Sequence, residues 1–97
     1  MVRRARVIRV DDAATFVIRP NMVVKLAGVS PPERGTPDAA RAKEKLEALV
    51  LGKKVEFDTL DWDRLGRSIA TVKVDGIDVN EEMAEFLKTL DRRVQEY

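Results

Sequence analysis

A single strong helix start divides this chain into two groups of β-rich segments. Thr36-Pro37-Asp38 offers a hydroxyl N-cap, a proline at the first helical position and an acid near the positive end of the helix dipole. Apolar residues then recur at helical spacing as far as Val50, and Gly52 suits the position after a helix, so we predict a helix over residues 37–51. The β-rich segments are Arg3–Val10, Thr15–Arg19 and Met22–Gly28 before this helix, and Lys54–Leu60 and Ser68–Val74 after it.

Five short strands with a helix between the third and the fourth are typical of a small closed Greek-key barrel of the OB type. Closure removes the sheet edges that a chain of 97 residues could not otherwise protect. A ferredoxin-like sandwich would instead place helices after the first and third strands. We therefore expect one domain over residues 1–97, a β-barrel with helices that is α+β by content.

The last part of the chain is typical of an amphipathic helix. Asp75-Gly76 predicts a tight turn, and Asn80 is interpreted as the N-cap of a final helix. The expected core-facing stripe of this helix is Met83, Phe86, Leu87, Leu90 and Val94, and it could extend to Tyr97.

Composition narrows the available chemistry. The chain has no cysteine and no histidine, which leaves oxygen-ligand metals and carboxylate or Lys/Arg chemistry. The 18 basic and 17 acidic residues nearly cancel, so any basic surface must be local. No apolar run approaches the roughly 20 residues that span a bilayer, and no secretory h-region is present. We expect a soluble, cytoplasmic protein without membrane contact.

The N-terminal run "RRAR" (residues 3–6), together with Arg9, leaves two interpretations open. These cations could extend a basic groove for a phosphate backbone, or they could be charges on a solvated edge strand, which we favour. The only tryptophan, Trp62, lies outside any aromatic-rich strand of the kind that stacks bases. The acids that would oppose a basic groove on the same side are Asp11, Asp12, Asp58, Asp61 and Asp63.

Four separated stretches share their order and spacing with a known family. "VKLAGVSPPE" is similar to V-R-L-x-G-I-D-A-P-E, "GKKVEF" to the strand that follows the helix, "DRLGRSIATV" to D-x-Y-G-R-x-L-A-x-V, and "DGIDVNEEM" to D-G-x-x-V-N-x-x-L. Over Val7 to Phe86 the chain thus resembles the staphylococcal-nuclease-like (thermonuclease) domain. The resemblance implies an OB-fold phosphodiesterase that binds Ca²⁺ with two aspartates, uses a glutamate as candidate general base and grips phosphate with two arginines.

Both metal-ligating aspartates of that family are replaced in this chain. The family's D-G-D-T motif aligns with Asp12-Ala13-Ala14-Thr15, so one ligand position falls on Ala14, and the other falls on Ser30. Asp11 or Asp12 could substitute only if the hairpin shifted register, which makes them weak metal candidates. Because Ca²⁺ needs about 6–8 oxygen ligands with several carboxylates, we expect no cofactor, or Ca²⁺ if the domain is active.

The family's other site positions are better matched. Lys25 takes the place of the first phosphate-binding arginine, which keeps the charge but loses the bidentate fork. Glu33 matches the glutamate and Arg67 the second arginine, so these three are the remnant catalytic positions if the domain is active. Arg34 and Arg64 join Lys25 and Arg67 as candidate nucleic-acid contacts.

These matched residues also have ordinary structural interpretations. Glu33 could be a solvated loop residue or form an ion pair with Arg67 or Lys25. Arg67 could instead form an exposed salt bridge with Asp61 or Asp63.

Two functions follow from this pattern. The favoured one is a degenerate nuclease-like OB domain with weak or no metal-dependent phosphodiesterase activity, which binds single-stranded nucleic acid or a protein. The alternative is an active, divergent Ca²⁺-dependent endonuclease. Loss of the metal removes several kcal/mol of transition-state stabilisation, or roughly 10³–10⁴-fold in rate. Relatives of this kind can carry a polysaccharide (succinoglycan) biosynthesis label, but no residue here speaks to sugar chemistry, and the sequence does not indicate the oligomeric state.

Overall fold

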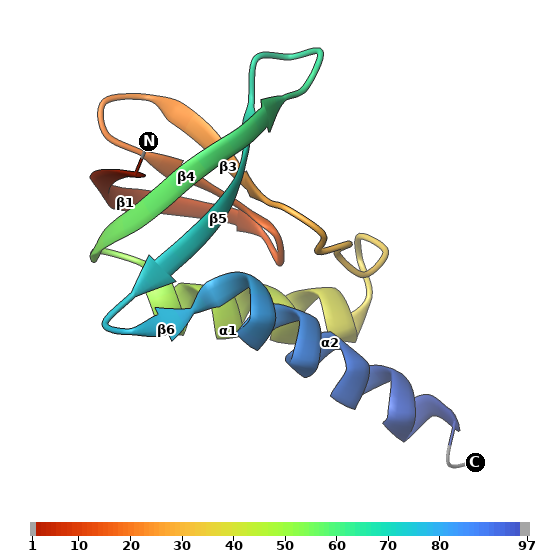
Figure 1. Cartoon of the computed structure of the whole chain (residues 1–97). Helices are drawn as coiled ribbons and strands as arrows, with labels where there is room; N and C mark the ends of the chain where they lie inside the picture. Colours follow the sequence, from red (N-terminus) through yellow and green to blue (C-terminus); the bar gives the residue numbers. More distant parts are fainter. Residues whose placement is uncertain (1, 96–97) are drawn as a thin grey trace.

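The structure is a computed structural model that describes the backbone of residues 2–95 and the side chains of residues 2–90 (Figure 1). In this part of the chain the elements follow in the order β1 (Val2–Asp12), β2 (Thr15–Ile18), β3 (Met22–Leu26), α1 (Pro37–Val50), β4 (Lys54–Trp62), β5 (Ser68–Val74), β6 (Ile77–Asp78) and α2 (Val79–Gln95). The two-residue β6 was not anticipated from the sequence. It arises because the turn at Asp75-Gly76 folds the chain back onto the end of β5.

The first five strands form a closed barrel. The sheet order is β3-β2-β1-β4-β5-β6, and a parallel pairing of β3 with β5 closes the barrel. The prediction of a five-stranded OB-type barrel with a helix between the third and fourth strands is therefore confirmed. Its interior is filled by alternate residues of the strands, such as Val24, Phe57 and Val72, which are buried.

The strand β1 is an interior strand of the sheet. It is 11 residues long, and its first half pairs with β4 while its second half pairs with β2. β1 as a whole lies between β2 and β4, but within the described residues the "RRAR" run (residues 3–6) has a strand ladder only with β4 and exposes its three arginines, as the interpretation of a solvated edge segment expects. The sequence could not reveal this double pairing because it depends on a bend of β1, which the register shift between Val7 and Arg9 introduces.

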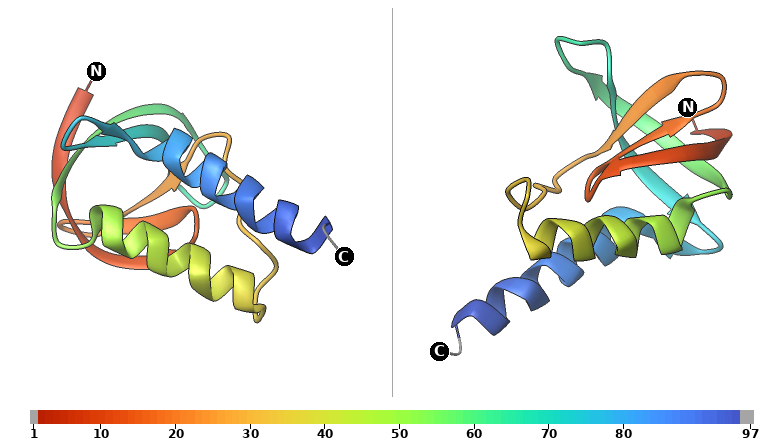
Figure 2. Two further views of the ribbon diagram at one scale, coloured as in Figure 1. Left: turned by 90° about the horizontal axis from the view of Figure 1, so that it is seen from below. Right: turned by 180° about the vertical axis from the view of Figure 1, so that it is seen from behind.

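The helix α1 begins as its sequence predicts. The Thr36 hydroxyl oxygen accepts a hydrogen bond from the backbone N–H of Ala39 at 3.1 Å, which confirms it as the N-cap. Ala42, Leu46 and Val50 lie on one face and are fully buried. Both helices lie below the barrel in Figure 1, and Figure 2 shows them side by side.

The start of α2 differs from the prediction. The Asp78 side chain, and not that of Asn80, accepts the backbone N–H of Glu81 at 3.1 Å and caps the helix. Asn80 instead accepts the backbone N–H of Val72 at 2.8 Å, and its amide donates to the carbonyls of Ala27 and Ala70 at 3.0 Å each. Asn80 thus ties the chain just after β3 to β5. An N-cap and a cross-strand tie use the same short polar side chain, so local sequence could not separate them.

The apolar stripe of α2 is confirmed as far as side chains are described. Met83 and Leu90 are buried in the core, and Phe86 and Leu87 pack against it half-buried. The side chain of Val94 and the whole of Tyr97 lie outside the described residues. Neither of the described helices is long and apolar enough to cross a membrane.

Candidate nucleic-acid interface

The parallel pairing of β3 and β5 brings two predicted phosphate-binding residues together. Val24 lies beside Ser68 and Lys25 beside Ile69 in this pairing. Val24 and Ser68 point inward and are buried, so Lys25 and Arg67, each one position away, lie on the outer face of the barrel. Two residues that are far apart in the sequence thus become neighbours where the barrel closes.

A carboxylate holds these two cations in place. Oδ2 of Asp63 accepts a hydrogen bond from Nε of Arg67 and lies 4.0 Å from Nζ of Lys25. Oδ1 of the same carboxylate accepts the backbone N–H groups of Leu65 and Arg67 at 2.9 Å each. Asp63 therefore closes the turn between β4 and β5 with one oxygen and orients the two cations with the other.

The environment of Asp63 keeps it ionised. Desolvation alone would raise the pKa of this carboxyl, but hydrogen bonds from the Arg67 and Leu65 backbone and from the Arg67 side chain, together with the charge of Arg67, hold the pKa below its ordinary value. The outer face between β3 and β5 accordingly carries two positive charges and one negative charge near neutral pH.

Glu33 does not join this cluster. Its side chain is exposed, and its carboxylate has no ion pair or side-chain hydrogen bond within residues 2–90. The expected ion pair with Arg67 or Lys25 is wrong because Asp63 engages both cations; of the two partners considered for Arg67, Asp63 is the one observed. The backbone carbonyl of Glu33 accepts the Thr36 hydroxyl at 2.7 Å, which attaches the Pro-rich loop to the start of α1.

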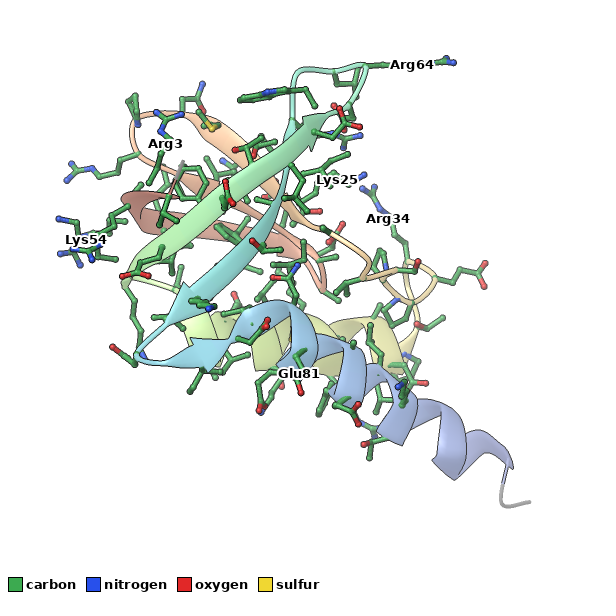
Figure 3. The ribbon with its side chains drawn as sticks, viewed as in Figure 1. Arg3, Lys25, Arg34, Lys54, Arg64 and Glu81 are labelled. Carbon is green, nitrogen blue, oxygen red and sulfur yellow. The ribbon has the colours of Figure 1, made fainter. Side chains whose placement is uncertain are left out.

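The other candidate contacts lie on either side of the cluster. Arg34 is exposed and rises from the loop toward the face that carries Lys25 (Figure 3). Arg64 is exposed at the tip of the β4–β5 turn and points away from the barrel (Figure 3).

The two residues that the sequence resemblance aligns with the family's metal ligands do not fit Ca²⁺. Ala14 is only 1% exposed and belongs to the hydrophobic core. Ser30 is exposed and offers a neutral hydroxyl. Across the described side chains, no three Asp, Glu, His or Cys residues converge on one point. A donor set of this kind lacks the carboxylates that Ca²⁺ requires.

The two weak metal candidates are engaged in other contacts. Oδ1 of Asp12 accepts the backbone N–H of Ala14 at 2.8 Å, and Asp11 forms a 2.8 Å ion pair with Arg9. Both aspartates line a hollow of about 690 Å³ that they share with two cations, Arg34 and Lys43. A divalent cation in this hollow would meet positive charges where it needs further carboxylates.

One member of the cluster was missed as a site residue. The sequence interpretation treated Asp63 as a salt-bridge partner for Arg67 and as one of the acids that oppose a basic groove, whereas its backbone contacts identify it as the residue that organises the turn. The available signal was an aspartate at the start of a loop containing Gly66, a pattern typical of Asx turns. Leu65 stands where the family pattern has a tyrosine, and its side chain is 76% exposed and carries no hydroxyl.

Comparisons with known proteins agree with this architecture. Residues 23–86 match the family described as "Staphylococcal nuclease homologue". A protein of Oryza sativa subsp. japonica named "Probable staphylococcal-like nuclease CAN1" is 37% identical over 60 residues, which cover 62% of this chain and 18% of that protein. An "Uncharacterized 38.1 kDa protein" of Capnoides sempervirens is 35% identical over 60 residues, with the same shares of 62% and 18%. The chain thus spans less than a fifth of the length of these relatives, and it belongs to the staphylococcal nuclease homologue family.

Proposed function

We propose that this domain is a nuclease-like OB-fold module that binds single-stranded nucleic acid through Lys25 and Arg67 and has weak or no metal-dependent phosphodiesterase activity. The observation that carries the proposal is a contrast within the family's site. Two cations lie together on the outer face of the barrel, while a buried methyl group and a neutral hydroxyl occupy the metal-ligand positions.

The cationic pair suits a phosphodiester group. Nε of Arg67 is occupied by Asp63, so its two terminal amino groups remain to donate to phosphate oxygens. Lys25 adds a point charge without a second fixed donor direction. Since Asp63 offsets part of this charge, we expect binding that is weak for a single site and strongly dependent on salt.

The arrangement supports little hydrolysis. The Glu33 carboxylate is exposed to water and separate from the Lys25–Asp63–Arg67 cluster, so no contact here positions it as a base. Without the Lewis acid and template that a metal supplies, several kcal/mol of transition-state stabilisation are missing, which corresponds to roughly 10³–10⁴-fold in rate.

Binding can be tested by fluorescence anisotropy with a labelled 12-nucleotide oligo-dT at low salt. The affinity of the double variant Lys25→Ala/Arg67→Ala should be lower by about tenfold or more, because both proposed phosphate-binding cations are removed. Lys88→Ala is the matched control, since it removes an exposed cation on α2 that pairs with Glu85 and lies outside the proposed interface. Equal affinity of the double variant and the control would refute the proposed interface.

Catalysis needs a separate assay. Single-stranded DNA and RNA are incubated with the purified domain and millimolar Ca²⁺ or Mn²⁺. We expect no turnover above that of a mock preparation. Turnover that disappears in Glu33→Gln or Arg67→Ala would instead establish the alternative, an active divergent nuclease.

A further inference from the structure

A second group of cations lies on the outer face of β1, β4 and β5. The register places Arg4 opposite Glu56, Arg6 opposite Lys54, and Glu56 opposite Lys73. The neighbours of these residues along β4 and β5 point inward and are buried, so the charged side chains share the outer face. We call this surface the basic face and define it by Arg4, Arg6, Lys54 and Lys73.

The positive charges of the basic face are only partly compensated. Arg4 pairs with Glu56 at 3.0 Å, and the Arg6 guanidinium donates to the carbonyl of Gly52. Among the described side chains, no carboxylate lies within ion-pair distance of Arg6, Lys54 or Lys73. Three cations on adjacent strands are thus left for an external anion.

One cross-strand pair is unfavourable as it stands. Arg6 and Lys54 are directly opposite each other in the antiparallel β1–β4 pairing. Like charges in this position destabilise a sheet, and a bound anion would remove the repulsion. The hydrogen bond to Gly52 accounts for a cation at Arg6, whereas no contact among the described side chains accounts for a second cation at Lys54.

The surface is hollowed where these charges gather. A depression of about 490 Å³ is lined by three cations, Arg4, Lys54 and Lys73, and by two carboxylates, Glu56 and Asp75, the second of which belongs to the turn after β5. Its size lies in the range of small-ligand pockets, about 300–1,000 Å³, and most of its lining is charged. It has no buried aromatic anchor of the kind on which protein interfaces centre, so its chemistry favours phosphate groups over a protein partner.

The basic face is distinct from the Lys25–Asp63–Arg67 cluster. The outer positions of β5 lead from Arg67 to Lys73, a separation of about 20 Å at roughly 3.3 Å per residue. Asp58 and Asp61 on β4 lie opposite outer residues of β5 between these two points. Figure 3 shows Lys54 and Lys25 at different sides of the barrel.

We propose that the basic face is a second binding site for single-stranded nucleic acid, which takes phosphate groups of the strand between Arg6, Lys54 and Lys73. It shares its ligand class with the proposed function but does not require the first site to bind. One strand that is long enough to contact both sites would gain affinity from the second contact through its high effective concentration.

The test compares three charge-reversal variants with a labelled 20-nucleotide oligo-dT. Lys54→Glu/Lys73→Glu alters the basic face, Lys25→Glu alters the first site, and Arg41→Glu/Lys88→Glu on the helices is the control with the same change of net charge as the first variant. We expect the basic-face variant to lose about tenfold in affinity at low salt, and its slope of log K against log salt to fall by about 1.4, or about 0.7 per phosphate contact. The control should stay within about twofold of the unmodified domain.

The outcomes separate this proposal from the proposed function. A basic-face variant that binds like the control overturns the second site, whatever Lys25→Glu does. Loss in the basic-face variant with full binding by Lys25→Glu supports the second site and refutes the first. Displacement of the labelled oligonucleotide by polyglutamate or by anionic lipid vesicles at the same or a lower concentration of negative charge than by unlabelled oligo-dT would overturn the assignment to nucleic acid.

Thermal unfolding without ligand distinguishes a loss of binding from a loss of folding in these variants. Lys54→Glu alone replaces a like-charge pair opposite Arg6 by an opposite-charge pair, so the thermal midpoint should rise by about 2–6 °C. If the double reversal does not fold, Lys54→Gln/Lys73→Gln removes the charges and should still lower the affinity by about threefold or more. An unchanged affinity in this milder variant would equally overturn the second site.

Discussion

The sequence resemblance aligns the junction of β3 with β5 and the turn between β1 and β2 with two parts of one family site, and these two regions differ in how many of that pattern's charged side chains they keep. At the junction, Lys25 and Arg67 are held by Asp63, whose carboxylate also closes a turn of the barrel. At the β1–β2 turn, Asp12 serves only the turn and Ala14 fills the core. Lys25 and Arg67 share a carboxylate that also stabilises a turn, so keeping them costs the fold little stability. Carboxylates that only bind a metal add little stability to the fold when no metal is bound.

Asn80 supports the junction and gives the largest expected effect. Asn80→Ala removes the hydrogen-bond partner of the Val72 N–H and of the Ala27 carbonyl, and one of the two donors to the Ala70 carbonyl, which should lower the free energy of unfolding by about 2–4 kcal/mol. Urea unfolding followed by circular dichroism measures this. Thr89→Ala, which removes one exposed hydroxyl contact on α2, should change the stability by less than about 0.5 kcal/mol. Similar losses in both variants would contradict the role assigned to Asn80.

Carboxylates can be introduced at Ala14 and Ser30, the two positions that align with the family's metal ligands. Ala14→Asp places a carboxylate in the core and should lower the free energy of unfolding by about 1–3 kcal/mol without metal. In Ala14→Asp/Ser30→Asp, millimolar Ca²⁺ should recover much of this loss, because a ligand that binds only the folded state stabilises it.

Calorimetric titration and thermal unfolding with and without Ca²⁺ test that variant. Ala13→Asp is the matched control, since Ala13 is equally buried but does not align with a metal ligand. The alignment at this turn would be incorrect if Ca²⁺ raised the stability of Ala13→Asp, or if it failed to raise the stability of Ala14→Asp/Ser30→Asp.

Asp63 should weaken anion binding while it orients Arg67. Asp63→Asn keeps an oxygen for the two backbone N–H groups and removes the negative charge beside Lys25, so oligo-dT affinity at low salt should rise about threefold. Anisotropy measures this, with Glu85→Gln on α2 as the control, since it removes one negative charge outside both proposed binding sites. A fall in affinity would mean that orienting Arg67 matters more than the offset charge.

The same carboxylate predicts a dependence of stability on pH. Because its pKa is lower in the folded than in the unfolded chain, Asp63 contributes stability above its ordinary pKa of 3.8, and this contribution is lost as the pH falls through the lower folded value. Thermal midpoints measured between about pH 2 and 5 should therefore fall more steeply for the unmodified domain than for Asp63→Asn. Parallel curves would show that Asp63 gains nothing from its partners.

Lys25 offers a further change with a small expected effect on affinity. Lys25→Arg supplies the fork that the family pattern has at this position and should raise affinity for oligo-dT by about two- to fivefold. Lys43→Arg on α1 is the control, since it makes the same exchange outside the cluster. Equal gains in both variants would indicate a general effect of arginine.

Local sequence determined most of the elements of this protein. Thr36-Pro37-Asp38 specifies the start of α1, and alternation of apolar residues specifies the strands, because caps and side-chain periodicity act within a few residues. The order of the elements was enough to predict the barrel, and the separated motifs were enough to indicate Lys25, Glu33 and Arg67 as site positions.

Tertiary structure alone decided which of those residues meet. The parallel closure of β3 on β5 brings Lys25 to Arg67 and leaves Glu33 apart, and the bend of β1 pairs its first half, which contains the "RRAR" run, with β4 and its second half with β2. Tertiary structure also determined that Arg67 pairs with Asp63 and that Asn80 connects β5 to the chain just after β3. Each depends on contacts between residues distant in the chain, whose geometry follows from barrel closure and not from the local preferences that a sequence displays.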